Sequence, residues 1–243
     1  MTKRRNITVI MVTLLFLCAL ILSYGMKGRF TLEEYSFSSE FTTYSMERTA
    51  LKVIGKNRLG VSKGGIRDTL ESLPYIEKAG VSVKGTALKI NAEEKDEGLI
   101  ITDGERWYFY SDGLSALDLR DVYPLSKRYL VLTVESSLLS SFLTSSFGSE
   151  EVKMIDTLKC VKPDSALITK AEYDNNNSNV YSGSLRLTLS SLNASLVIKD
   201  IRDISRVDEA VSIMETEYSE SSDRLSGVTT EYVLSDGMLI RMR

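Results

Sequence analysis

The feature that most constrains the fold is a change of periodicity within residues 73–97, LPYIEKAGVSVKGTALKINAEEKDE. The stretch opens at Pro74, a residue suited to the first position of a helix. It then alternates apolar and polar residues, as a half-buried strand does, and it ends in an acidic run. Because helix and strand signals lie so close together, we expect one small unit that contains both.

The residues around this stretch predict the order of elements in that unit. Residues 51–55 alternate as a first strand, and Ser62 is a suitable N-cap for a following helix. A second short helix is expected over 74–80. Residues 81–92 alternate on both sides of a Lys-Gly-Thr turn, which predicts a hairpin. The order strand, helix, helix, strand, strand indicates a compact unit with a three-stranded sheet.

A larger region with mixed strand and helix signals follows. Several short alternating runs are separated by turn dipeptides such as Asp103-Gly104. An amphipathic run over 203–219 places Val207, Val211, Met214 and Tyr218 at helical spacing, and we expect this stripe to face a core. The expected elements are strands over 99–102, 107–110, 167–173, 185–189 and 196–198, a helix over 149–160, and strand-like residues 228–240 with a break at Asp236-Gly237.

An uncharged apolar run of 18 residues, from Ile7 to Tyr24, follows Lys3, Arg4 and Arg5. Its length is at the short end of what crosses a bilayer, and the basic flank orients the N-terminus toward the cytoplasm. We expect a transmembrane signal anchor over 7–25, although a cleaved signal peptide stays open as the alternative. The anchor residues are Ile7, Leu14, Leu17, Leu22 and Tyr24.

The composition argues against catalysis. The 243 residues include no histidine, which removes the commonest general base and the commonest zinc ligand. The sequence holds no SxxK motif, no P-loop and no GxGxxG fingerprint. The net charge of −3, with three basic residues placed before the apolar run, disfavours nucleic acid as a partner of the main body. We therefore expect no enzyme, no cofactor and no metal site.

Polar groups that could suggest a site have simpler explanations. The acidic run 93–97 lacks the spaced ligands and glycine of a calcium loop, so we expect a solvated strand end. Asp103 and Asp112 could be taken for a glycosidase pair, but each precedes a glycine in a turn position, and a turn role is favoured. Cys160 is expected to be a small buried apolar residue.

The motifs, taken in order, resemble the POTRA domain of the FtsQ/DivIB family of bacterial cell-division proteins. The aromatic strand and Asp-Gly turn over 108–113 resemble the opening of the second, β domain of that family. Two positions depart from the family pattern, because Glu97 replaces a proline and Glu231 replaces an arginine. The residues that carry the POTRA resemblance are Leu51, Val53, Gly55, Val61, Ser62, Ile66, 73–81, Leu88, Ile90, Ala92, Glu94 and Lys95.

The resemblance implies an α+β fold with a single N-terminal transmembrane helix. A small POTRA domain (strand-helix-helix-strand-strand) and then a β domain with a mixed sheet and helices are expected to follow it. The implied divisions are a cytoplasmic tail (1–6), a transmembrane signal anchor (7–25), a membrane-proximal linker (26–47), the POTRA domain (48–95) and the β domain (96–243).

The function implied by the resemblance is a non-enzymatic divisome scaffold in the bacterial cytoplasmic membrane at the division septum. Its N-terminus would be cytoplasmic and its body extracytoplasmic, linking division proteins on the two sides. FtsB/DivIC-like and FtsL-like bitopic proteins would dock on the β domain by strand addition, and other divisome components on the POTRA domain. The implied contact residues on the last strand are Thr230, Tyr232, Leu234, Met238 and Ile240, for which closing the domain core stays an open alternative.

Three other functions are alternatives to this one. A POTRA-bearing envelope export or assembly factor would need tandem POTRA units or a following barrel. An anchored envelope hydrolase would need a base and a nucleophile that the sequence does not offer. A membrane-anchored extracytoplasmic domain of unrelated role stays open.

Overall fold

The computed structural model describes residues 11, 13–18, 30–144, 148–161, 168–174, 183–220 and 229–242. The chain divides into two compact units. The first comprises Met1–Thr42 and Met46–Glu93, and the second comprises Thr43–Ser45 and Glu94–Arg243. The division after Glu93 lies close to the predicted boundary between residues 95 and 96.

The predicted N-terminal transmembrane helix requires a correction. Within 7–25 the structure describes residue 11 and residues 13–18, all of them helical. Leu14 and Leu17 are exposed there, whereas Ile7, Leu22 and Tyr24 lie outside the described residues. Among the residues that the structure describes, no helix has both the length and the apolar character needed to cross a membrane. This finding overturns the transmembrane part of the predicted fold class.

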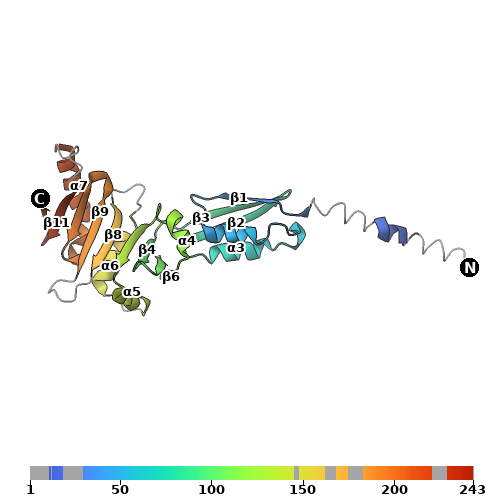
Figure 1. Ribbon diagram of the computed structural model, residues 1–243, viewed down its shortest axis with the longest axis horizontal. Coiled ribbons are helices and arrows are strands. Elements are labelled where there is room, and N and C mark those ends of the chain that lie inside the picture. Colours follow the sequence, from blue (N-terminus) through green and yellow to red (C-terminus); the bar gives the residue numbers. More distant parts are fainter. Residues whose placement is uncertain are drawn as a thin grey trace, which may run out of the picture. The chain divides into compact units, whose positions relative to one another are not determined.

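The first unit contains a three-stranded mixed sheet with two helices (Figure 1). The strand order is β1-β3-β2, and β1 runs parallel to β3. The elements follow the predicted order strand, helix, helix, strand, strand. They are β1 (Glu34–Ser38), α2 (Tyr44–Leu51), a 3₁₀ turn η2 (Arg58–Gly60), α3 (Lys63–Glu71), β2 (Ile76–Lys84) and β3 (Ala87–Glu94).

The core of this unit is formed by apolar residues from its helices and strands. Leu88 and Ile90 of β3 are buried, and their in-register partners on β1 are Tyr35 and Phe37. The side chain of Ser62 accepts a hydrogen bond from the N–H of Gly65 at 3.0 Å. Ser62 is therefore the N-cap of α3, as predicted.

The first strand does not lie where the sequence pattern placed it. Residues 51–55 form the last residue of α2 and the turn that follows. Met46 and Ala50 are buried at helical spacing, and this spacing places Leu51 at the end of a helix. The first strand is β1, inside the predicted linker 26–47, where it pairs with β3.

The predicted second helix over 74–80 is also wrong, because β2 begins at Ile76 and continues to Lys84. A turn at Gly85, with a φ of +65°, joins β2 to β3. Pro74 precedes the strand and leaves its hydrogen bonding intact. Pairing with β3 therefore outweighs the local helix signal.

The second unit is built on a nine-stranded mixed sheet with the order β12-β11-β10-β9-β8-β7-β4-β5-β6. The pairs β4/β7, β7/β8 and β10/β11 are parallel, and the other neighbouring pairs are antiparallel. An α+β architecture with a mixed sheet and helices was predicted for this region. The strands are β4 (Leu99–Thr102), β5 (Trp107–Tyr110), β6 (Leu114–Ala116), β7 (Leu130–Val134), β8 (Ile168–Asp174), β9 (Ser184–Leu189), β10 (Ala194–Ile198), β11 (Thr230–Ser235) and β12 (Met238–Met242).

Helical segments cover one face of this sheet with a continuous core (Figure 1). Val207 and Met214 are buried in that core, and Val211 and Tyr218 are partly buried against it, which confirms the predicted inward stripe. The helical segments that contribute buried residues to this core are α5 (Ser136–Leu143), α6 (Ser149–Leu158), η3 (Ser190–Leu192), η4 (Ile201–Arg206) and α7 (Val207–Glu220). The helix α4 (Leu119–Leu125) contributes none, since its buried Val122 and Leu125 lie outside this core.

The opposite face of the sheet is covered near β4 and β5. Phe109 points to this face because its neighbours Tyr108 and Tyr110 pack against the main core. Its ring meets that of Tyr129 edge-on, with 4.9 Å between centroids. The hydroxyl of Tyr129 in turn donates to the carbonyl of Lys95 at 2.6 Å.

Candidate partner-binding edge

The strand β12 ends the nine-stranded sheet on the C-terminal side, and no described strand pairs with its outer edge. It follows β11 through the two-residue turn Asp236-Gly237, whose φ angles of +52° and +73° are those of a tight hairpin turn. Nη1 of Arg206 donates to the carbonyl of Gly237 at 2.6 Å. The turn immediately before the edge strand is thus hydrogen-bonded to η4.

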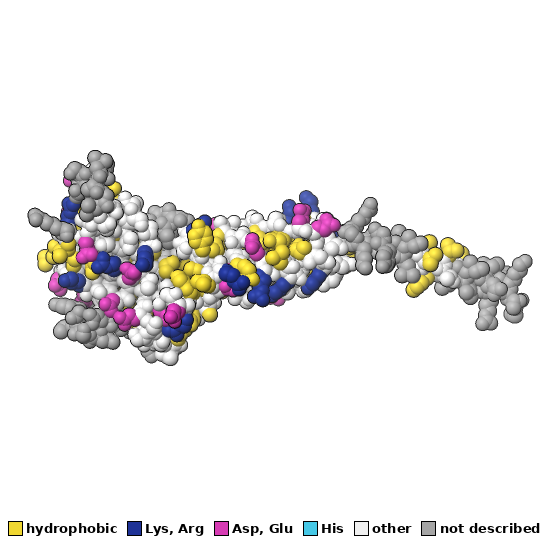
Figure 2. Space-filling view, viewed as in Figure 1, with side chains coloured by type: hydrophobic (Ala, Val, Ile, Leu, Met, Phe, Trp, Pro, Cys, Tyr) yellow, Lys and Arg dark blue, Asp and Glu magenta, His cyan; other side chains and the backbone are white. Residues whose placement is uncertain are grey.

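One face of β12 carries an exposed apolar row. Met238, Ile240 and Met242 alternate along the strand and are 62%, 47% and 46% exposed. Leu239 lies on the other face, where it packs partly buried against the core. Figure 2 shows hydrophobic side chains among charged ones at the end of the molecule that carries the C-terminus. The edge therefore offers both a strand backbone and an apolar surface.

The register of the hairpin determines which backbone groups point outward. Ser235 and Met238 are paired across the two-residue turn, so they exchange both hydrogen bonds of the closing pair. Hydrogen-bonded and non-hydrogen-bonded pairs alternate along an antiparallel ladder. The N–H and C=O of Ile240 therefore also point toward β11. The N–H and C=O of Leu239 then face away from β11, in the direction from which another strand can approach.

The structure separates the predicted contact residues into two groups. Met238 and Ile240 lie on the edge strand. Thr230, Tyr232 and Leu234 lie on β11, which pairs with β10 on one side and β12 on the other. Tyr232 and Leu234 are only 4% and 2% exposed. The expectation that these three residues lie on the last strand is wrong, because the chain turns at Gly237 and adds β12 outside β11.

Tyr232 instead joins the sheet to a helix. Its hydroxyl donates to Oε2 of Glu217 on α7 at 2.9 Å. Tyr232 and Leu234 belong to the main core cluster. For these two residues the structure agrees with the alternative prediction, that they close the core of the domain.

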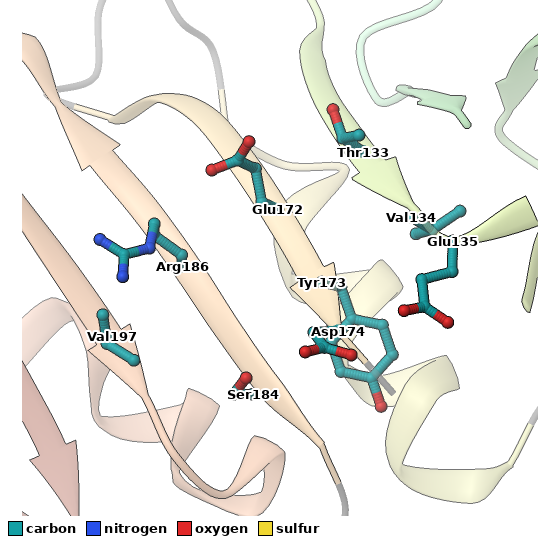
Figure 3. Close-up of a pocket in the computed structure, with 9 residues that line it drawn as sticks. All are labelled: Thr133, Val134, Glu135, Glu172, Tyr173, Asp174, Ser184, Arg186 and Val197. Atoms are coloured by element: carbon teal, nitrogen blue, oxygen red, sulfur yellow. The ribbon is translucent and has the colours of Figure 1, made fainter. Parts of the chain in front are cut away.

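A pocket of about 380 Å³ lies near the ends of β7, β8 and β9 (Figure 3). Glu172, Arg186 and Val197 lie side by side on three neighbouring strands. Its lining residues are Thr133, Val134, Glu135, Glu172, Tyr173, Asp174, Ser184, Arg186 and Val197.

Two charged residues of the pocket form ion pairs with residues outside its lining. Glu172 pairs with Lys170 at 2.7 Å, and Arg186 pairs with Glu231 at 2.8 Å. All four side chains are about half exposed. Burial raises the pKa of the Tyr173 phenol above its ordinary value, which keeps that group neutral. The pocket is thus a hollow on a solvated sheet face that carries paired charges.

Asp103 and Asp112, which could be taken for a glycosidase pair, lie in bends between strands. Oδ1 of Asp103 accepts hydrogen bonds from the N–H groups of Glu105 and Arg106 at 3.2 and 2.8 Å. The predicted turn role of Asp103 is thereby confirmed. The carboxylate of Asp112 is exposed and lies 3.3 Å from Nζ of Lys95.

The acidic run after β3 makes ion pairs within the second unit. Asp96 lies 3.2 Å from Nη2 of Arg128, and Glu97 lies 3.5 Å from Nζ of Lys159. In the described part of the chain, no group of three or more acidic or cysteine side chains is arranged to hold a metal ion. Cys160 is exposed, so its prediction as a buried residue is wrong.

Two features of the edge were missed in the sequence. Met242 completes the apolar row, and its signal was the alternation of MLIRM over 238–242. The helix α7 is hydrogen-bonded through Glu217 to Tyr232 of β11, the strand next to the edge strand, and no local pattern indicates that contact. No family model matches the chain, and no curated protein matches it either.

Proposed function

We propose that this protein is a non-enzymatic scaffold of the bacterial division machinery that docks a small bitopic partner at β12. The partner would be an FtsB/DivIC-like or FtsL-like protein that adds a strand to the nine-stranded sheet. The proposal rests on the resemblance to the FtsQ/DivIB family. The order strand, helix, helix, strand, strand in the first unit supports it, as does a second unit whose sheet ends in the C-terminal strand.

The observation that carries the proposal is the outer edge of β12 with its apolar row. An edge strand that ends a sheet is a template for another strand unless charge, proline or a covering element protects it. Met238, Ile240 and Met242 add apolar area on one side of that template. Strand addition uses the backbone for affinity and such alternate side chains for specificity.

A proline at the outward-facing position tests the docking mode. Leu239→Pro removes the N–H that faces away from β11, whereas Leu239→Ala keeps it and loses similar packing. Candidate partners would be co-purified with the full chain and with each variant. We expect Leu239→Pro to abolish capture and Leu239→Ala to retain it. Equal capture by both variants would exclude pairing at this edge.

The division role is tested in cells. A fluorescent protein fused to the N-terminus is expected to collect at midcell before constriction begins. Leu239→Pro should reduce recruitment of the partner to the same place. A fluorescent signal spread evenly over the cell would contradict the proposed role.

A further inference from the structure

The helix beside the edge strand is strongly acidic. The α7 sequence is VDEAVSIMETEYSE, which contains no lysine or arginine. Its core-facing residues are apolar, so the charge lies on the remaining faces. The acidic residues are Asp208, Glu209, Glu215, Glu217 and Glu220.

Contacts at two points show that α7 runs alongside the hairpin. Near the start of the helix, Nε of Arg206 lies 3.6 Å from Oε2 of Glu209, and the same guanidinium binds the carbonyl of Gly237. Toward its end, Glu217 accepts the hydrogen bond from Tyr232. Tyr232 is paired with Arg241 of β12. These contacts join the start of α7, through Arg206, to the turn before β12, and its later part, through Glu217, to β11, the neighbour of β12.

One flank of α7 therefore lies on the side of β11 and β12. Glu209, Ile213 and Glu217 are four residues apart and share that flank. Ile213 is 43% exposed although it is apolar. The flank therefore presents the apolar side chain of Ile213 between the carboxylates of Glu209 and Glu217.

A strand added to β12 would meet different surfaces on its two faces. Side chains that point to the open face of the sheet would lie beside Met238, Ile240 and Met242. Side chains that point to the other face would lie toward α7. Since strand side chains alternate, the added segment needs two different residue types in turn.

We infer that the partner segment alternates apolar residues with lysine or arginine, and that its basic residues face α7. This inference rests on the proposed function, because it names the chemistry of the strand that docks there. Lysine and arginine fit this flank for two reasons. Their aliphatic stems can cover Ile213, and their charged ends can reach Glu209 and Glu217. Two of the five carboxylates of α7, Glu209 and Glu217, lie on this flank. The basic residues at this end of the sheet are Arg206, which lies 3.6 Å from Glu209, and Arg241, the one basic residue of β12.

The charge also disfavours a second copy of this chain as the occupant. Antiparallel pairing of β12 with itself would place both α7 helices on the same face of the joined sheet. Their acidic flanks would then approach each other, and like charges in such a position weaken association. A strand with basic side chains would instead be attracted to the acidic flank of α7.

Two dye-labelled peptides test the inference. In one peptide valine alternates with lysine, and in the other valine alternates with glutamate. Binding to the full-length protein would be followed by fluorescence anisotropy at low salt. We expect the lysine peptide to bind at least about tenfold more tightly than the glutamate peptide, and its binding to weaken as salt is raised.

Matched variants locate the charges responsible. Glu209→Gln with Glu217→Gln removes two charges from the flank toward β12, while Asp208→Asn with Glu215→Gln removes two from the rest of α7. We expect the first pair to weaken binding of the lysine peptide by about fivefold and the second pair to change it much less. Leu239→Pro should prevent binding, and Leu239→Ala should not.

The outcomes separate this inference from the proposed function. Equal binding of both peptides, lost in Leu239→Pro, would overturn the basic pattern and leave docking at β12 standing. Equal effects of the two double variants would likewise overturn the assignment to this flank. Absence of binding by either peptide, or self-association that Leu239→Pro removes, would overturn the inference. The proposed function is judged separately by partner capture, and it fails if Leu239→Pro and Leu239→Ala capture the partner equally.

Discussion

The hydroxyl group of Tyr232 donates a hydrogen bond to Oε2 of Glu217 at 2.9 Å, and this bond ties β11 to α7. Tyr232 is almost completely buried, so its hydroxyl depends on a partner within the protein. Because Tyr232 is also paired with Arg241 of β12, the bond holds the helix beside the strand pair that ends the sheet.

Removing this hydroxyl should destabilise the second unit. We expect Tyr232→Phe to lower the free energy of unfolding by about 1 kcal/mol, because a buried hydrogen bond is lost with little change in packing. Urea denaturation of the purified protein measures the change. Tyr123→Phe is the control, since Tyr123 is 74% exposed. Identical midpoints for Tyr232→Phe and the wild type would show that the bond contributes nothing.

Gly98 has no room for a side chain. A Cβ atom there would collide with Cζ of Phe109, whose buried ring is held against Tyr129. We expect Gly98→Ala to lower the free energy of unfolding by about 2 kcal/mol through overpacking. Denaturation of Gly98→Ala with Phe109→Leu should show partial recovery, because the smaller side chain frees space. Gly60→Ala serves as the control, since nothing lies within 4 Å of its Cβ position.

Asp103 should make stability depend on pH in the acid range. Hydrogen bonds from Arg106, with its backbone N–H first, hold the pKa of Asp103 well below its ordinary value of 3.8. A lowered folded-state pKa adds stability above the unfolded-state value, and this stability is lost as the pH falls through the folded-state value. The difference in melting temperature between wild type and Asp103→Ala should therefore shrink below about pH 4.

Thermal melts over the acid range measure that difference. Asp112→Ala provides the comparison, because the carboxylate of Asp112 is 95% exposed. A gap between wild type and Asp103→Ala that stays constant down to the lowest pH would contradict the role assigned to the charge of Asp103.

The hairpin turn before β12 should resist substitution at its glycine. Gly237 has a φ of +73°, and a Cβ atom there would collide with Nη1 of Arg206. We expect Gly237→Ala to cost about 1 kcal/mol of unfolding free energy. Asp236→Gly should be tolerated, because Asp236 also has a positive φ, +52°. Hydrogen exchange at β12 would show the loosening, and unchanged protection in Gly237→Ala would refute it.

Local features of the fold followed from the sequence where neighbouring residues decide them. The N-cap Ser62, the turns at Asp103-Gly104 and Asp236-Gly237, and the inward stripe of α7 each depend on groups a few residues apart. The order of elements in the first unit was predicted too, although the first strand and the second helix were assigned to the wrong residues.

The candidate site was predicted only in part. Met238 and Ile240 were placed on an edge strand, whereas Thr230, Tyr232 and Leu234 were not separated from them. The same alternation of apolar residues runs through both strands, so the pattern cannot distinguish a strand with two neighbours from one with a single neighbour.

The sequence by itself therefore determined the caps, the turns, the helix face and the presence of alternating strands. The tertiary structure decided that residues 34–38 pair with β3, that residues 76–84 are a strand, and that β12 forms the edge of the nine-stranded sheet. The physical reason is that strand hydrogen bonds join residues far apart in the chain, and a local pattern carries no record of which distant partner satisfies them.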